Sequence, residues 1–347
     1  MTEAEGPVPG GEDLVLEVED LRVSFETHEG TVPAVSGATF SMRRGRTTAL
    51  VGESGCGKSV TSFAILRLIQ KPGRIVGGAI HFRPRTGERI DIAALADDDE
   101  ILYDLRGGQI GMVFQEPMTA LSPVHTIGEQ IAEAVRLHTG QSPEDAKERA
   151  IEMLSRVGIP GARQRVDQYP FEMSGGMRQR VVIAMALACG PELLIADEPT
   201  TALDVTIQAQ IMGLLKDLQH DMGASTLLIT HDLGVVAQLA DDVAVMYLGR
   251  VVETADVRTV MKSPRHPYTV GLLQSLPGLA DDHGRLPSID GSVPSPQETP
   301  PGCPFHPRCP HAMPGICDRG APPPLQSMTD GHAVACARVH EIDVGAV

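Results

Sequence analysis

The chain has 347 residues, of which 42% are hydrophobic, and a formal charge of -16 at pH 7. This length and apolar content are enough for about two globular domains with a sizeable core. Because Lys and Arg form no long run in so acidic a chain, general nucleic-acid binding is disfavoured, although a local basic patch is compatible with the composition.

Membrane spans and secretion leaders are also not indicated. The longest apolar stretch, around Val181 to Cys189, is roughly half the length that crosses a hydrocarbon core, and no basic-then-apolar leader opens the chain. We therefore expect an unsecreted protein that meets a membrane only through a partner. Its six cysteines then predict free thiols or a metal site rather than a disulfide framework.

The chain begins with a segment rich in Gly, Pro, Glu and Asp, and residues 1–13 are predicted to be a disordered tail. The alternation of apolar residues over Leu14–Val18 then predicts an edge strand of a sheet.

Four short apolar runs further along predict the central sheet. Continuous apolar character without alternation is typical of parallel strands that are covered on both faces. The runs cover residues 47–51, 110–114, 193–196 and 227–230. Each is followed by polar residues, namely the segment from Gly52, then Gln115, then Asp197 with Glu198, and then His231. Because parallel strands share one carboxyl edge, these polar groups are expected to form one ligand site in an α/β fold.

After the first run, the sequence fits a phosphate-binding loop. The residues are Gly52, Glu53, Ser54, Gly55, Cys56, Gly57, Lys58 and Ser59, and a helical run starts at Val60. Backbone N–H groups of such a loop face an anion, and the N-terminus of the next helix adds positive charge. Lys58 is expected to reach the β- and γ-phosphates and Ser59 to ligate Mg²⁺. The alternative is a Gly-rich turn that merely follows a strand.

The acidic pair after the third run supplies complementary chemistry. Asp197 can hold the Mg²⁺ shell, and Glu198 can polarise the attacking water as a general base. Two acidic residues after a strand also occur as a solvated turn. The pair therefore indicates a catalytic role only together with the phosphate loop.

The segment Met173–Arg180 indicates to which family of phosphate-loop proteins the chain is similar. Ser174, Gly175 and Gly176 can cap the helix that follows, and they can also form an anion site at its N-terminus. The segment resembles the signature motif of the ATP-binding-cassette (ABC) family, and the order of all the motifs agrees with that family. The resemblance covers about residues 14–262.

The resemblance implies a P-loop NTPase cassette of the α/β class. Such a cassette has a central, mainly parallel sheet, an antiparallel edge subdomain and a helical subdomain, here at about residues 91–171. The helical subdomain carries the docking surface for a membrane permease, and patterns over 126–138 and 143–157 predict helices in it.

The family also assigns roles by position. Two cassettes meet head to tail, so that Ser174, Gly175 and Gly176 of one complete the ATP site of the other. Phe25 aligns with the adenine-stacking aromatic, although core packing explains it equally well. Gln115 would contact Mg²⁺ or the water, Asp204 in Ala202–Leu203–Asp204 would couple the two sites, and His231 would contact the γ-phosphate.

Composition changes near residue 262. Fifteen of the 27 prolines lie in residues 263–347, and this density excludes long helices and central strands there. The segments Arg265–Thr269, with Leu272 and Leu273, and Gly302–Pro310 are similar to the C-terminal extension of oligopeptide and dipeptide importer ATPases.

This second resemblance implies ATP-driven uptake of oligopeptides or dipeptides. The partners it implies are two integral-membrane permease subunits, a second and related ABC ATPase subunit, and an extracytoplasmic solute-binding protein, with the chain held peripherally on the cytoplasmic face of the membrane. Nickel and oligosaccharide importers belong to the same group and stay open as alternatives. A soluble ABC ATPase of DNA repair or translation and an exporter ATPase are disfavoured by the single compact cassette and by the importer-like extension.

Four cysteines crowd into the extension. They are Cys303, Cys309, Cys317 and Cys336, separated by five, seven and eighteen residues. A Pro-rich segment with few apolar runs needs a cross-link to offset the entropy of ordering. These intervals lack the C-x-x-C pairs of most zinc sites, and resemblance to dipeptide-importer ATPases favours a [4Fe–4S] cluster over zinc or four free thiols. Cys56 and Cys189 are instead explained by local packing.

Overall fold

The structure is a computed structural model, and it describes residues 13–115, 120–200, 204–276, 289–329, 331–342 and 344. Residues 1–12 of the predicted tail and Ala202 and Leu203 of the predicted site lie outside the described residues. The strands are β1 (Leu14–Thr27), β2 (Gly30–Arg43), β3 (Thr47–Val51), β4 (Gly73–Phe82), β5 (Ile90–Asp91), β6 (Ile110–Val113), β7 (Leu193–Asp197), β8 (Ser225–Thr230), β9 (Asp242–Tyr247), β10 (Arg250–Asp256), β11 (Gln326–Thr329) and β12 (His332–Val334).

The α-helices are α1 (Lys58–Ile65), α2 (Ile101–Leu105), α4 (Ile127–Thr139), α5 (Pro143–Arg156), α6 (Ala162–Arg165), α7 (Gly175–Leu187), α8 (Val205–Met222), α9 (Leu233–Leu239), α10 (Val257–Lys262) and α11 (Pro267–Gln274). The short 3-10 helices are η1 (Ile92–Ala94), η2 (Pro170–Glu172), η4 (Pro296–Glu298) and η5 (His306–Arg308). None of the helices that the structure describes is long and apolar enough to cross a membrane.

The central sheet has eight strands in the order β11-β12-β10-β9-β3-β8-β7-β6. The five strands β9, β3, β8, β7 and β6 pair in parallel with one another. The pairs β9–β10, β10–β12 and β12–β11 are antiparallel. The four predicted apolar strands are therefore real and adjacent, in the order β3-β8-β7-β6. Their carboxyl ends meet at one edge, as the sequence predicts.

Both faces of this sheet are covered. Along β7, Leu193 and Ile195 face the core that includes α1, while Leu194 and Ala196 face the core that includes α7 and α8. The lack of alternation in the sequence follows directly, because successive side chains of a strand point to opposite faces and both are buried here.

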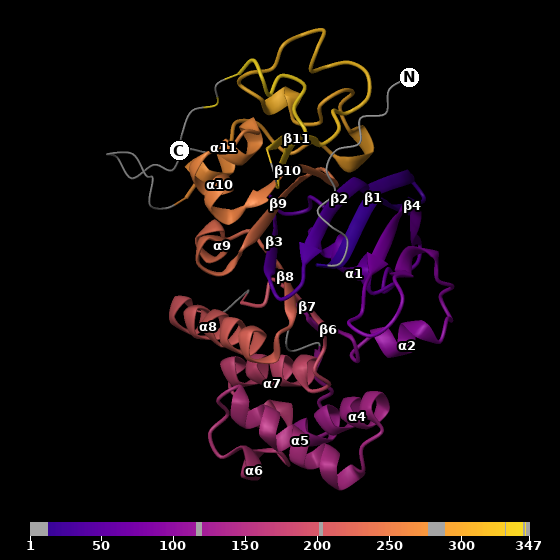
Figure 1. Ribbon diagram of the computed structural model, residues 1–347, viewed down its shortest axis with the longest axis vertical. Coiled ribbons are helices and arrows are strands. Elements are labelled where there is room, and N and C mark those ends of the chain that lie inside the picture. Colours follow the sequence, from indigo (N-terminus) through magenta and orange to yellow (C-terminus); the bar gives the residue numbers. More distant parts are fainter. Residues whose placement is uncertain are drawn as a thin grey trace.

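A four-stranded antiparallel sheet, in the order β2-β1-β4-β5, lies beside the central one (Figure 1). The prediction of an edge strand at Leu14–Val18 is wrong, because β1 lies between two partners. Val18, for example, is paired with Phe40 of β2 and with Ile80 of β4. The alternating pattern reports one buried face of a strand but carries no information on the backbone partners at its two sides.

Helices α4, α5, α6 and α7 form one end of the molecule, and the C-terminal extension forms the other end (Figure 1). Local signals account for the helix starts. Thr126 and Glu129 form a capping box at α4, and Ser142 caps α5 with Pro143 in its first turn.

The C-terminal extension is joined to the central sheet. Strand β12 pairs with β10, and β11 pairs with β12. Buried Glu253 of β10 accepts hydrogen bonds from the backbone N–H groups of Arg265 (2.7 Å) and His266 (3.0 Å) and pairs with Nε2 of His332 (2.9 Å). A buried carboxylate is tolerated only with such partners, so these contacts fix both ends of the extension on one strand.

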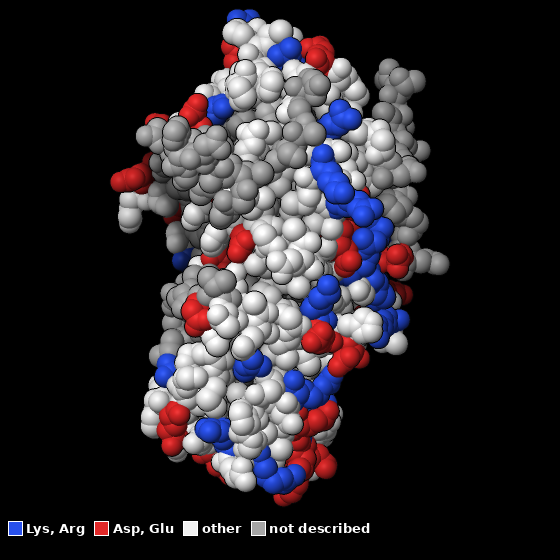
Figure 2. Space-filling model, turned by 90° about the vertical axis from the view of Figure 1, so that its left-hand side faces the viewer, with Lys and Arg blue, Asp and Glu red and all other residues white. Residues whose placement is uncertain are grey.

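Charges are unevenly distributed over the surface. On the face shown in Figure 2, Lys and Arg side chains gather into a band along one side, with Asp and Glu side chains next to it. Among the ion pairs of the protein, Arg43 and Arg46 both bond to Asp242, and Arg44 bonds to Glu192. The net negative charge thus coexists with a local basic band.

Candidate ATP site

The predicted phosphate loop connects β3 to α1 at the carboxyl edge of the central sheet. It is tightly enclosed at two glycines with positive φ, Gly52 (156°) and Gly57 (104°). A Cβ at Gly52 would overlap the carbonyl oxygen of Met246, and one at Gly57 would lie 2.5 Å from the carbonyl oxygen of Ala34. Only glycine fits either position, because both the conformation and the space exclude a side chain.

The lysine of the loop is buried, with Lys58 only 5% exposed. Its Nζ donates to the carbonyl oxygens of Gly52 (2.8 Å) and Glu53 (3.0 Å), and it lies 3.8 Å from Sγ of Cys56. Within the described chain Lys58 takes part in none of the ion pairs. A buried ammonium held by carbonyl oxygens and a thiol suits an anionic ligand, since an opposite charge would offset the cost of its burial.

The rest of the predicted loop differs in exposure. Ser54 and Gly55 are exposed at its tip, whereas Cys56 is buried, and burial raises the pKa of the Cys56 thiol. Val60 lies in the first turn of α1 and is partly exposed. Cys56 therefore packs as a protonated thiol rather than serving as a reactive thiolate.

Asp197, at the end of β7, faces the start of α1. Its carboxylate accepts hydrogen bonds from the hydroxyls of Ser59 (3.1 Å) and Ser62 (3.4 Å), and the residue is 2% exposed. Burial raises the pKa of Asp197, although the hydroxyl of Ser59 acts in the opposite direction. A desolvated carboxylate next to a serine hydroxyl is the hard oxygen donor set that Mg²⁺ prefers, and the ion would restore the charge balance that burial disturbs.

Glu198 is held between two of the predicted site residues. Its Oε2 accepts from Nε2 of Gln115 (3.1 Å), and its Oε1 pairs with Nδ1 of His231 (3.1 Å). Its backbone has a positive φ of 44°, and its N–H donates to the carbonyl of Ile229 on β8. Such a conformation is strained for a residue with a side chain, and strain of this kind gathers at functional sites. The sequence did not indicate it.

The signature residues lie apart from this loop. Ser174 is exposed and caps α7, where its hydroxyl accepts from the N–H of Met177 (3.4 Å); Gly175 is exposed and Gly176 partly so. Helix α7 covers the sheet face opposite to the face that α1 covers. Asp204 is exposed and caps α8, accepting from the N–H of Ile207 (3.0 Å).

Phe25, the predicted adenine-stacking aromatic, is partly buried on β1. Its ring covers Gly73 of the neighbouring strand, where a Cβ would lie 2.5 Å from the ring. Core packing thus accounts for one face of the ring, and stacking on an adenine stays a prediction for the other.

The four C-terminal cysteines line one pocket, together with His266, Phe305 and residues around Arg338. Burial raises the pKa of Cys303 to about 11 and raises the pKa of Cys309 and Cys336 as well. In the part of the chain that is described, however, no three His, Cys, Asp or Glu side chains are disposed to hold a metal ion. The four thiols therefore line one pocket but are not grouped around a single metal ion.

A sheet of this topology, with a glycine loop around a buried lysine after β3 and a carboxylate pair at the end of β7, defines a P-loop nucleoside triphosphatase. The ABC transporter family model matches residues 35–201, and the model for the oligopeptide/dipeptide transporter C-terminal region matches residues 252–317.

Relatives agree over nearly the whole length. The chain is 48% identical to the oligopeptide transport ATP-binding protein OppD of Salmonella typhimurium, over 96% of each chain. It is 50% identical to the dipeptide transport ATP-binding protein DppD of Bacillus subtilis, over 93% of this chain and 94% of that one.

Solved structures agree in fold. A dimeric ATP-binding cassette in a post-hydrolysis state with ADP and Pi has a TM-score of 0.61 and 28% identity over 70% of this chain and 99% of its own. CbiO1 from Clostridium perfringens, part of an ABC transporter complex, has a TM-score of 0.59 and 30% identity over 72% and 91%. The chain therefore belongs to the ABC transporter family, in the group that carries the oligopeptide/dipeptide transporter C-terminal region. It is an ATPase that binds ATP with Mg²⁺.

Proposed function

We propose that this chain is one of two ATP-binding subunits of an importer for oligopeptides or dipeptides. The observation that carries the substrate class is similarity along both parts of the chain, since relatives named for oligopeptide and dipeptide transport match the cassette and the extension together at about half identity. The permease pair, the related second ATPase subunit, the extracytoplasmic receptor and the location at the cytoplasmic face of the membrane belong to this proposal.

Hydrolysis follows from the site's geometry. The loop around Lys58 binds the phosphates, and Ser59 with Asp197 would hold Mg²⁺, which supplies charge neutralisation on the phosphates when bound. Glu198, fixed at 3.1 Å from both Gln115 and His231, takes the proton of the attacking water. Gln115 and His231 orient that carboxylate, and His231, 66% exposed, is free to contact the γ-phosphate.

The second half of each site comes from the partner subunit. Ser174 and Gly175 are exposed and Gly176 is partly exposed at the N-terminus of α7, so they are available to a nucleotide on a facing cassette. The dimeric post-hydrolysis relative supports this arrangement. Asp204 would couple the two halves, and Phe25 would stack on the adenine.

Transport is tested with proteoliposomes that contain this chain, its partner ATPase, the permease pair and the receptor. ATP-dependent uptake of labelled di- and oligopeptides is expected, and Glu198→Gln is expected to abolish it. Uptake of Ni²⁺ or an oligosaccharide instead of peptides would contradict the substrate class. ATP turnover that needs no permease and drives no uptake would favour a soluble ABC ATPase.

We further propose that Cys303, Cys309, Cys317 and Cys336 hold a [4Fe–4S] cluster that staples the extension. The proposal is supported by four thiols around one pocket in a segment with little core of its own. Since burial raises the pKa of three of them, cluster binding would have to displace their protons. Protein purified without oxygen should contain iron and sulfide in near-equal amounts, and Cys309→Ser should lose both. A colourless preparation with zinc, or without metal, would contradict the cluster and leave the ATPase assignment intact.

A further inference from the structure

The C-terminal extension contacts the phosphate loop directly, at Glu53. Arg308 of η5 forms a bidentate ion pair with the Glu53 carboxylate, at 2.8 Å and 3.1 Å. The backbone N–H of Glu53 donates to the hydroxyl of Tyr268 on α11, at 2.9 Å. Both the side chain and the backbone of this loop residue are thus held by residues far along the chain.

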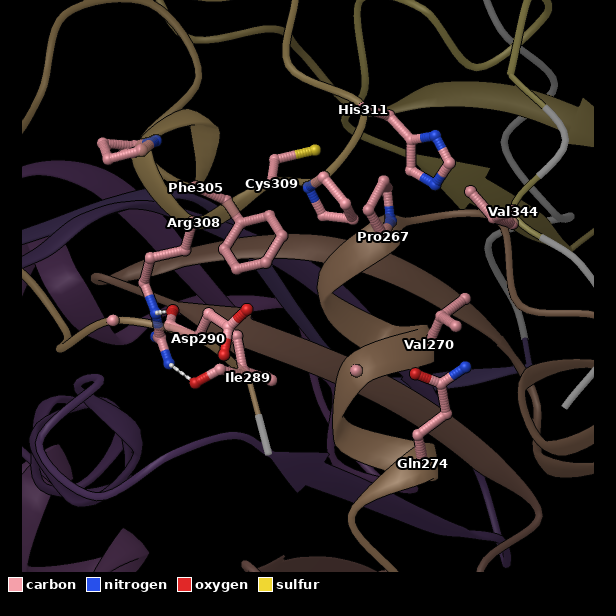
Figure 3. A pocket seen from close by; sticks show the side chains of 14 residues that line it. Pro267, Val270, Gln274, Ile289, Asp290, Phe305, Arg308, Cys309, His311 and Val344 are labelled. Carbon is pink, nitrogen blue, oxygen red and sulfur yellow. Dashed lines mark hydrogen bonds between the residues drawn. The ribbon is translucent and has the colours of Figure 1, made fainter. Parts of the chain in front are cut away.

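Arg308 is itself fixed on the side of the extension. Its Nε donates to the carbonyl of Asp290 (3.1 Å) and its Nη2 to that of Ile289 (3.4 Å), and Figure 3 shows its side chain directed toward these two residues. The guanidinium carbon lies 5.9 Å from the ring centre of Tyr247 and 6.0 Å from that of Phe305. Since the Arg308 side chain is 5% exposed and that of Glu53 is 27% exposed, the arginine is the fixed partner and the loop residue is the one it positions.

Tyr268 is fixed in the same way. It is fully buried, and its ring lies 4.7 Å from the ring of Tyr247 and 5.3 Å from that of Phe305. Burial raises the pKa of Tyr268 well above its usual value, so the hydroxyl stays protonated. Aromatic clusters of this kind leave little freedom to a side chain, and the hydroxyl is therefore a rigid acceptor for Glu53.

Glu53 in turn positions the ammonium that meets the phosphates. Its carbonyl oxygen accepts from Nζ of Lys58 (3.0 Å) and from the N–H of Cys56 (3.3 Å). A shift of Glu53 therefore moves two groups of the phosphate loop, and Arg308 and Tyr268 bond to this loop at Glu53. The contacts run from the extension through Glu53 to Lys58.

We propose that Arg308 and Tyr268 are positioning residues for ATP: they set the conformation of the phosphate loop through Glu53, and the C-terminal extension is thereby part of the ATP site. This inference rests on residues 52–59 binding the phosphates of ATP. Figure 3 shows Arg308 and Cys309, neighbours in sequence, directed to different sides of η5, so the turn that carries the positioning arginine also carries one of the four thiols.

The test compares affinity for Mg²⁺ and a non-hydrolysable ATP analogue in the full-length chain. Arg308→Gln, Glu53→Gln and Tyr268→Phe should each raise Kd about tenfold, in the range typical of coupling between sites. Because Arg308 and Glu53 act as one pair, the variant with both Arg308→Gln and Glu53→Gln should bind the analogue no more weakly than the weaker-binding of the two single variants. Arg308→Lys keeps the positive charge but cannot form the bidentate pair, so it should bind the analogue more tightly than Arg308→Gln and less tightly than the natural chain.

Arg44→Gln is the matched control, because Arg44 is a partly buried arginine that is ion-paired to Glu192 and bonds to the carbonyl of Arg83, outside the ATP site and the extension. It should leave Kd unchanged. Folded Arg308→Gln or Glu53→Gln protein with wild-type affinity would overturn the proposal, as would equal losses in Arg308→Gln and Arg44→Gln, or additive losses in the double variant. If Arg308→Gln does not fold, Tyr268→Phe and Glu53→Gln decide by the same criterion. A wild-type chain without affinity for the analogue would instead refute the ATP site itself.

Discussion

His266 makes the stability of the extension depend on pH. Its ring is buried, it caps α11 by accepting the N–H of Tyr268 at Nδ1 (3.1 Å), and it lies 5.9 Å from the ring of Phe305. Burial lowers the pKa of His266 from 6.5 to about 4 in the folded protein. Between these values the unfolded chain binds a proton that the folded chain does not, so this stability is fully present above pH 6.5, is lost as pH falls from 6.5 to 4, and is absent below pH 4.

The size of the loss follows from the two pKa values. One unit of pKa difference corresponds to about 1.4 kcal/mol, so the full effect is about 3 kcal/mol below pH 4. At pH 5 about 2 kcal/mol of it has been lost, because the ionised fraction in the folded state is still small. Burial alone would raise the pKa of neighbouring Glu253, but the hydrogen bonds from His332 and its other partners outweigh burial and lower this pKa below its usual value, so Glu253 is mainly ionised at both pH 7 and pH 5.

The assay is denaturant unfolding at pH 7 and pH 5, for the natural chain and for His266→Asn. Asparagine also caps a helix N-terminus but does not titrate in this range. The variant will be less stable at both values because it loses the packing on Phe305, so the comparison concerns only the change with pH. The natural chain should lose about 2 kcal/mol more than the variant between pH 7 and pH 5. Equal losses would show that His266 is not held neutral and would refute the reasoning.

Two further predictions concern hydrolysis. Glu198→Gln should bind ATP like the natural chain but turn it over roughly 10² to 10⁴ times more slowly, because the substitution removes the general base and keeps the shape of the side chain. Lys58→Ala should instead weaken ATP binding itself, so measurements of equilibrium binding and of single-turnover rates separate the two effects. A Glu198→Gln variant with the turnover of the natural chain would show that Glu198 is not the base. Ser174→Arg should abolish hydrolysis at the partner's loop and ATP-dependent dimerisation while its own loop still binds ATP, and dimerisation that survives the change would argue against the head-to-tail site.

The central sheet could be predicted because burial on two faces leaves a simple trace in the sequence. The runs that became β3, β6, β7 and β8 contain no charged residue and show no apolar–polar alternation, and each ends within one residue of the end of its strand. The phosphate loop could be predicted for a related reason, since its glycines are required by backbone conformation and close packing.

Other features leave no local trace. The neighbours of β1 are set by β2 and β4, and the positive φ of Glu198 is set by the backbone contact with Ile229. The pair of Glu53 and Arg308 joins residues 255 positions apart. Each residue lies in a segment with a motif of its own, but neither motif indicates that the two segments are in contact. An ion pair between distant residues leaves no periodic pattern in the sequence.

The position of the extension does leave one signal in the sequence. Glu253 interrupts the apolar run of β10, and a charged residue inside a buried strand requires partners. Those partners, the N–H groups of Arg265 and His266 and the ring of His332, all come from the extension. The interruption could therefore have indicated that residues after 262 return to the sheet.

These contacts bear on why an ATPase of this family carries an extension next to its phosphate loop. A coupling between two sites is reciprocal, so if Arg308 and Tyr268 favour the conformation of Glu53 that binds ATP, bound ATP must favour the same arrangement of Arg308 and Tyr268 by an equal free energy. The extension has little apolar core of its own, and its order depends on Glu253, on the rings around Phe305 and on Glu53. Two of these anchors are permanent parts of the sheet and its covering core, whereas the third belongs to a loop that changes ligand in each cycle. The degree of order of the extension is therefore the property that can change when ATP binds or leaves.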